Sequence, residues 1–174
     1  ANAMQKDIQD CLDSQGSIKA DYFIRKPISL NEVQGMVAAI SQKIVAQMKG
    51  KVLVVDDDGF NLKLICELLD KHYLQHIEAT NGEQAVIKFK ENHEEIFLVI
   101  MDMEMPVMNG LDATKSIKAF LKEKNLQDVP IIGLTAHAGE GYRNQGIEAG
   151  MMKVMSKPIN LNEFAKMIHH FSEY

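Results

Sequence analysis

Short apolar segments alternate with longer amphipathic segments from residue 51 to the end of the chain. The apolar segments predict β-strands over residues 51–55, 76–79, 96–101, 130–134 and 152–155. After each of them, apolar residues return every three or four positions, which is the spacing of one helix face. This spacing predicts helices over residues 60–73, from 81–83 through 89, and over 110–122, 140–149 and 161–171. The pattern is therefore a strand followed by a helix, five times over.

Strands of this kind predict an α/β fold in which helices cover both faces of a parallel sheet. Almost uninterrupted apolar strands are typical of sheets that are buried on both faces. Right-handed crossovers then place every strand's carboxyl end at one edge, and ligands bind beyond that edge. The polar residues at or just after the strand ends are therefore the candidate site: Asp56, Asp57, Asp102, Thr135 and Lys157.

These residue types indicate phosphoryl chemistry that depends on a metal ion. Three carboxylates in one place repel one another, and Mg²⁺ would relieve that repulsion because it favours carboxylate oxygens together with water and phosphate oxygens. Asp102 could then act as a nucleophile toward phosphorus and form an aspartyl phosphate. Lys157 and the hydroxyl of Thr135 could receive the negative oxygens of the transferred group.

Four segments carry a resemblance to the response-regulator receiver family of two-component signalling. They are VLVVDDD (52–58), VIMDMEMPVMNG (99–110), IIGLTAHA (131–138) and KVMSKPI (153–159), and they occur in the family's order. The resemblance implies a flavodoxin-like, doubly wound (βα)5 receiver fold with parallel strand order 2-1-3-4-5. It also implies a histidine kinase or a histidine phosphotransfer protein as the phosphoryl donor.

The resemblance assigns the acidic residues individually. Asp102 matches the phosphoacceptor. Asp57 matches the direct Mg²⁺ ligand, and Asp56 matches the acid that acts on the metal largely through water. Glu104 matches the residue whose backbone carbonyl binds the metal.

The remaining family positions include one departure. Thr135 matches the switch hydroxyl, and Lys157 matches the lysine that pairs with the acceptor or its phosphate. The bond between Lys157 and Pro158 matches one that is often cis in the family. Where the family often has an aromatic switch residue, this chain has Val154. The threonine of the usual threonine–aromatic pair is therefore present, and the aromatic residue is missing.

Several nearby residues have simpler interpretations. Asp58 is interpreted as a helix-start residue, and His137 as an exposed loop histidine, because the acceptor role already falls to Asp102. His169 and His170 are interpreted as surface residues on the last helix.

Two other functions remain as alternatives. One is an interaction module that works without phosphorylation; Val154 favours it, and the complete set of site residues argues against it. The other is a Mg²⁺-dependent, haloacid-dehalogenase-like phosphatase. That class has a second Asp two positions after the nucleophile, where this chain has Glu104.

The first fifty residues contain part of an internal repeat. FIRKPISLNEVQGMVAAI (23–40) aligns with VMSKPINLNEFAKMIHHF (154–171) at an offset of 131 residues. A single repeat at this distance predicts two copies of one domain in tandem. We therefore interpret residues 1–3 as a cloning remnant and residues 50–174 as the receiver. Residues 4–49 are interpreted as a helix–strand–helix remnant of a preceding receiver plus a connecting helix, cut from a tandem-receiver or hybrid histidine kinase protein.

An apolar stripe on that connecting helix needs a partner. Its residues recur every three or four positions, and an apolar face is unlikely to stay in water, so we expect it to pack on the domain or to form a homodimer. The stripe comprises Leu30, Val33, Val37, Ile40, Ile44 and Met48.

The composition of the chain argues against several classes of protein. The net charge of −5 over 174 residues argues against nucleic-acid binding, and no apolar run approaches the roughly 20 residues that span a bilayer. The two cysteines, Cys11 and Cys66, indicate neither a disulfide framework nor a zinc site. A reducing, cytoplasmic location is the expectation.

Overall fold

The computed structural model describes residues 31, 33–35, 37, 50–137 and 139–172. The chain divides into two compact units, Ala1–Ile44 and Val45–Tyr174. In the first unit the described residues are helical. The interpretations of residues 1–49 as remnant, connecting helix and dimer contact lie almost entirely outside the described residues, and they stay predictions.

The second unit is built on a parallel sheet. Its strand order is β2-β1-β3-β4-β5, and every neighbouring pair is parallel. This confirms the predicted order 2-1-3-4-5. The strands are β1 (Lys51–Val55), β2 (Gln75–Ala79), β3 (Ile96–Asp102), β4 (Ile131–Thr135) and β5 (Lys153–Ser156).

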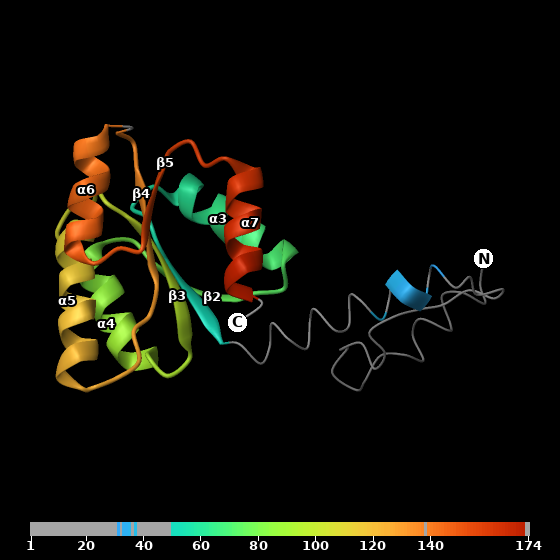
Figure 1. The fold of residues 1–174 in the computed structure, drawn as a ribbon, viewed down its shortest axis with the longest axis horizontal. Helices are drawn as coiled ribbons and strands as arrows, with labels where there is room; N and C mark the ends of the chain where they lie inside the picture. The colour runs from blue at the N-terminus through green and yellow to red at the C-terminus, as the bar shows by residue number, and fades with distance from the viewer. Residues whose placement is uncertain (1–30, 32, 36, 38–49, 138, 173–174) are drawn as a thin grey trace. The chain divides into compact units, whose positions relative to one another are not determined.

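Helices cover both faces of this sheet (Figure 1). Helices α3 and α7 lie on one face, and α4, α5 and α6 lie on the other. The helices are α3 (Gly59–Lys71), α4 (Gly82–Asn92), α5 (Gly110–Glu123), α6 (Glu140–Ala149) and α7 (Leu161–Ser172). The architecture is therefore the doubly wound (βα)5 fold that the sequence pattern predicts.

Alternate residues of each central strand enter opposite halves of the core. Val52 and Val54 pack with the α3 and α7 side chains, whereas Leu53 and Val55 pack with those of α4 and α5. Successive side chains of a strand point to opposite faces, so each apolar strand serves both layers at once. This burial fixes the register, because a shift of one residue would exchange the two sets.

Polar side chains fix where several of the helices begin. The Asp58 carboxylate accepts hydrogen bonds from the backbone N–H groups of Phe60 and Asn61 at the start of α3, which confirms its interpretation as a helix-start residue. Asn81 and Asn109 do the same for α4 and α5. Such side chains satisfy N–H groups that have no partner within the helix.

Two expectations need correction. Helix α3 ends at Lys71 rather than at residue 73, because Tyr73 adopts a left-handed backbone with φ of 59° and cannot continue a right-handed helix. Burial on both faces holds for the central strands but not for β2, where Gln75 and Glu78 are exposed. Strand β2 lies at the sheet edge, so its side chains are only partly covered.

Candidate functional site at the carboxyl edge of the sheet

Strand register brings the candidate site residues to one edge. Val55, the last residue of β1, pairs with Met101, so Asp56 just after β1 and Asp102 at the end of β3 lie side by side. Thr135 ends β4 and pairs with Ser156 of β5, the residue before Lys157. Residues separated by up to 101 positions in the sequence are thus in direct contact.

Lys157 joins the two buried acids. Its Nζ atom donates hydrogen bonds to Asp56 Oδ2 and Asp102 Oδ2, both at 2.7 Å. The two carboxylates are 0% and 5% exposed, so solvent contributes little to their stabilisation. Asp56 also accepts from the backbone N–H of Asp58 at 3.0 Å. One cation therefore bridges the ends of three strands.

Asp57 completes a group of three carboxylates. Ligand oxygens of Asp56, Asp57 and Asp102 lie within 4.8 Å of one another, and the Asp57 side chain, unlike the other two, belongs to an exposed residue. Lys157 supplies one positive charge against three negative ones. A set of oxygen donors with excess negative charge and one open side fits a hard dication such as Mg²⁺.

Burial shifts the protonation of this group. It raises the pKa of Asp102, and the hydrogen bonds from Lys157 and from the backbone of Glu104 only partly oppose that effect. Burial alone would lower the pKa of Lys157, but its hydrogen bonds to Asp102 and Asp56 prevail and raise it. Lys157 therefore remains charged, while the ionised form of Asp102 is held at a free-energy cost that a bound cation would offset.

The other two predicted site residues flank the acceptor. Thr135 is 1% exposed, and its Oγ1 accepts a hydrogen bond from the backbone N–H of His137 at 3.0 Å. The backbone N–H of Glu104 donates to Asp102 Oδ1 at 3.2 Å. This N–H group stabilises the ionised form of the buried carboxylate. The role of the Glu104 carbonyl as a metal ligand stays a prediction.

Sequence reasoning missed a side-chain contact beside this site. His137 Nε2 lies 2.9 Å from Glu104 Oε1, and the His137 ring stacks on Tyr142 with centroids 4.3 Å apart. His137 is exposed, as expected, with 51% of its side chain accessible, but it has specific partners. The sequence alone could not predict this contact, because its three residues come from separate parts of the fold: the segment after β3, the β4–α6 connection and α6.

Val154 occupies a site with little room for a larger side chain. It is 8% exposed, and its Cγ2 atom lies close to the backbone of both Gly133 and Gly146. The absence of side chains at these glycines lets α6 approach β4 and β5. The departure seen in the sequence is therefore a packed core residue, not an empty aromatic position.

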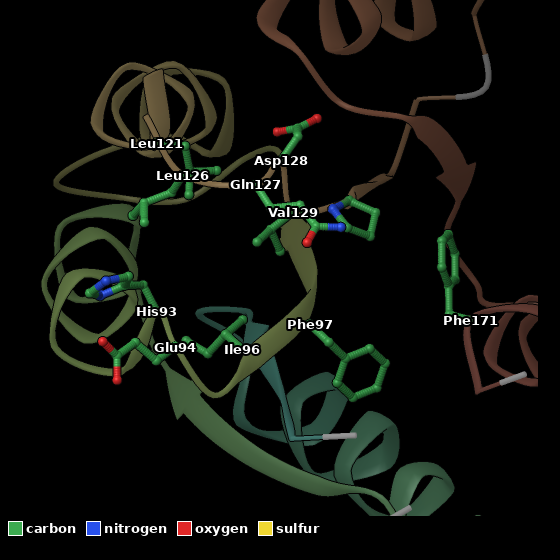
Figure 2. Close-up of a pocket in the computed structure, with 11 residues that line it drawn as sticks. His93, Glu94, Ile96, Phe97, Leu121, Leu126, Gln127, Asp128, Val129 and Phe171 are labelled. Atoms are coloured by element: carbon green, nitrogen blue, oxygen red, sulfur yellow. The ribbon is translucent and has the colours of Figure 1, made fainter. Parts of the chain in front are cut away.

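A pocket lies at the opposite edge of the sheet (Figure 2). Ile96 and Phe97 at the start of β3 and Phe171 of α7 line it, together with His93 and Glu94 after α4. None of the predicted site residues lines this pocket. The carboxyl edge therefore remains the candidate site.

Together, the fold and the site define a doubly wound α/β domain with an acidic group, a lysine and a threonine at the carboxyl edge. A sequence profile of the response regulator receiver domain matches residues 52–169. The chain belongs to the response regulator receiver domain family.

Similar proteins agree with this assignment. Two-component response regulator 24 of Arabidopsis thaliana is 33% identical over 132 residues, which cover 75% of this chain and 89% of that protein. Hybrid signal transduction histidine kinase M of Dictyostelium discoideum is 38% identical over 109 residues, 63% of this chain and 5% of the kinase. Sensor protein GacS of Pseudomonas syringae pv. syringae is 35% identical over 68% of this chain and 13% of its own length. The chain thus spans a small part of these two longer relatives.

Two solved structures share the fold. The first is the complex of the Saccharomyces cerevisiae histidine phosphotransfer protein Ypd1 with the receiver domain of Ssk1. It matches with TM-score 0.67 and 30% identity, over 71% of this chain and 89% of that one. The CheX–CheY–BeF3–Mg²⁺ complex from Borrelia burgdorferi matches with TM-score 0.63 and 26% identity, over 70% of this chain and 87% of that one.

The receiver assignment disfavours the phosphatase, and the intact site disfavours the phosphorylation-independent module. None of the described helices has the length and apolar character needed to cross a bilayer.

Proposed function

We propose that this receiver accepts a phosphoryl group on Asp102 and thereby switches its contacts with partner proteins. The observation that carries the proposal is the bridge from Lys157 to Asp56 and Asp102, with both hydrogen bonds at 2.7 Å. It fixes the acceptor carboxylate beside a cation and a second acid. A carboxylate prepared in this way is suited to attack on phosphorus.

Mg²⁺ would be held by Asp57 and Asp102, with Asp56 assisting, and would neutralise charge on the transferring oxygens. Asp102 attacks through one oxygen, a P–O bond forms, and the bond from phosphorus to the donor's imidazole nitrogen breaks. The departing imidazole takes up a proton. Lys157 exchanges its contact with the Asp102 carboxylate for one with a phosphoryl oxygen, and Thr135 turns its hydroxyl toward another. Water later cleaves the acyl phosphate and regenerates Asp102.

The proposed donors are a histidine kinase or a histidine phosphotransfer protein. The relatives support this: several are hybrid histidine kinases, and one structural neighbour is a receiver bound to a histidine phosphotransfer protein. Because such kinases draw on ATP, the proposal places the reaction in the cytoplasm. A parent protein that is a hybrid kinase or a tandem-receiver regulator accords with these relatives, and the homodimer through residues 4–49 stays part of the proposal.

The experiment that tests this function uses a small phosphodonor. The full chain is incubated with acetyl phosphate and Mg²⁺, and its intact mass is recorded with time. We expect a single phosphoryl adduct that is absent when EDTA replaces Mg²⁺ and absent in Asp57→Ala. Asp58→Ala is the matched control, because its carboxylate caps α3 and is not one of the three carboxylates grouped at the site.

Two results would reject the proposal. An unmodified mass, in a chain whose circular dichroism shows it to be folded, would favour the phosphorylation-independent module. Sustained hydrolysis of a general phosphomonoester would favour the phosphatase.

A further inference from the structure

A second group of metal-binding side chains lies between α3 and β2. Cys66 and Asp70 are one turn apart on α3 and share a helix face, whereas His76 and Glu78 are two residues apart on β2 and share a strand face. Ligand atoms of Cys66, His76 and Glu78 lie within 4.8 Å of one another. We name these four residues the α3–β2 cluster. It shares no residue with the carboxyl-edge site.

Donor atoms of three residues in this cluster, Cys66, His76 and Glu78, are near enough to one another to approach a single ion. His76 Nε2 lies 3.6 Å from Glu78 Oε1, and His76 Nδ1 lies 3.6 Å from Asp70 Oδ1. Ligand atoms that are 2.0–2.3 Å from a tetrahedral Zn²⁺ are roughly 3.3–3.8 Å apart. The distance from His76 to Glu78 falls in this range, and Cys66 lies within 4.8 Å of both, so the three donor atoms would have to draw closer to bind one ion.

The imidazole of His76 has unused hydrogen-bonding capacity. Its Nδ1 atom is buried and has no hydrogen-bond partner among the described residues. A buried polar atom without a partner costs free energy. In metal sites the second nitrogen of a ligating histidine usually donates to a carboxylate, and Asp70 lies on the Nδ1 side of this ring.

Charge in the cluster also favours a cation. Within residues 50–137 and 139–172, the ion pairs of Asp70 and Glu78 involve His76 and no lysine or arginine. Two carboxylates and a thiol therefore face a single imidazole. Glu78 is half exposed, with 54% of its side chain accessible, which leaves an ion a route from solvent.

We propose that Cys66, His76 and Glu78 bind a transition-metal dication of the Zn²⁺ class, with Asp70 positioning His76. One sulfur, one nitrogen and one oxygen donor suit Zn²⁺, whereas Mg²⁺ takes oxygen donors. As the metal–sulfur bond forms, the Cys66 proton passes to solvent, and water completes the fourth position. The ion would tie the edge strand β2 to α3.

A reactive thiol is a weaker interpretation of Cys66. The residue is 6% exposed, and burial together with Glu78 and Asp70 raises the pKa of the thiol to about 12. A buried, protonated thiol is a poor nucleophile. Its charged neighbours are the carboxylates of Glu78 and Asp70 rather than the cationic groups that activate a cysteine.

The experiment uses Co²⁺ as a spectroscopic probe on the full chain. Cys11→Ser is the parent, so that Cys66 is the only thiol, and excess Mg²⁺ occupies the carboxyl-edge site. We expect one equivalent of Co²⁺ to give a thiolate-to-cobalt charge-transfer band that Zn²⁺ abolishes by displacement. Zn²⁺ at 100 times its Kd should raise the ratio of folded to unfolded protein about 100-fold.

Single substitutions test whether the α3–β2 cluster itself holds the ion. Cys66→Ser should lose the band, and His76→Gln should bind at least about tenfold more weakly, whereas His72→Gln, an exposed histidine beyond α3, should match the parent. Circular dichroism without metal checks that each variant folds. A band that survives Cys66→Ser, equal affinity of His76→Gln and His72→Gln, or loss of binding in Asp102→Asn would overturn the proposal.

Discussion

At the scale of single residues, Asp102 shows how burial and pairing oppose each other. Asp102 as a whole residue is only 3% exposed, so the charge of its carboxylate depends on Lys157 and on the Glu104 N–H. Its raised pKa shows that these contacts do not fully replace water. Much of the affinity for a cation would come from the removal of this imbalance.

Asp102→Asn should therefore stabilise the metal-free protein at pH 7. Because the folded-state pKa of Asp102 is above its ordinary value of 3.8, the wild-type carboxyl contributes most to stability below pH 3.8. That contribution is lost as pH rises through the folded-state pKa. Urea unfolding in EDTA should show the variant more stable at pH 7, with the difference disappearing toward pH 4. A less stable variant at pH 7 would contradict this interpretation of the site.

The contact between Glu104 and His137 lies beside the acceptor and should limit the access of water to its phosphate. Glu104→Ala and His137→Ala should each shorten the lifetime of the acyl phosphate, measured as decay of the phosphoryl adduct by intact mass. Because the two side chains form one contact, the double variant should decay no faster than the faster single variant. Fully additive effects would show that the residues act separately.

At the scale of elements, neighbouring acids at the start of α3 have separable roles. Asp58→Ala should lower the free energy of unfolding by about 0.5–2 kcal/mol, because two helix N–H groups lose their acceptor, while phosphorylation is retained. Asp57→Ala should do the reverse, with little change in stability and loss of Mg²⁺-dependent phosphorylation. Urea unfolding and intact mass measure the two effects. Loss of phosphorylation in Asp58→Ala, with a destabilised but phosphorylated Asp57→Ala, would refute the assignment of Asp58 as the helix cap and Asp57 as the metal ligand.

The start of α5 depends on a close backbone approach. A Cβ atom at Gly110 would collide with the carbonyl oxygen of Asp102, whereas a Cβ at Gly59, the first residue of α3, would meet open space. Gly110→Ala should therefore cost about 1–3 kcal/mol and slow phosphorylation by displacing Asp102. The control Gly59→Ala should change stability by less than about 0.5 kcal/mol. Equal stabilities of the two variants would contradict the packing.

The elements were largely predictable from sequence, and some contacts were not. Short apolar runs predicted every strand from residue 51 onward, and the 3.6-residue period predicted every helix, because burial dictates both patterns. Asp102, Lys157 and the other motif residues could be predicted since each stands at a strand end. The residues of the Glu104–His137 contact and of the α3–β2 cluster form no recognisable motif in the sequence. They become visible only when the fold brings separate elements together.

At the scale of the whole molecule, the described domain separates its chemistry by position. The carboxyl edge carries the acids and Lys157, the α3–β2 cluster lies on one face, and the pocket of Figure 2 opens at the other edge. Val154 packs closely under α6. It stands where the family often has an aromatic switch residue. In the proposed function, a phosphorylation signal would pass through Thr135 and the β4–α6 connection, with valine rather than an aromatic side chain at position 154.

Asp102 is the proposed phosphoacceptor of this domain. Borohydride reduces an aspartyl phosphate to homoserine, so reduction after incubation with acetyl phosphate and Mg²⁺ marks the modified position permanently. Peptide mass mapping should then find homoserine at position 102, with Asp56, Asp57 and Asp58 unchanged, and no homoserine in Asp102→Asn. Homoserine at another aspartate, or an unmodified position 102 in a chain that carries the phosphoryl adduct, would show that Asp102 is not the acceptor.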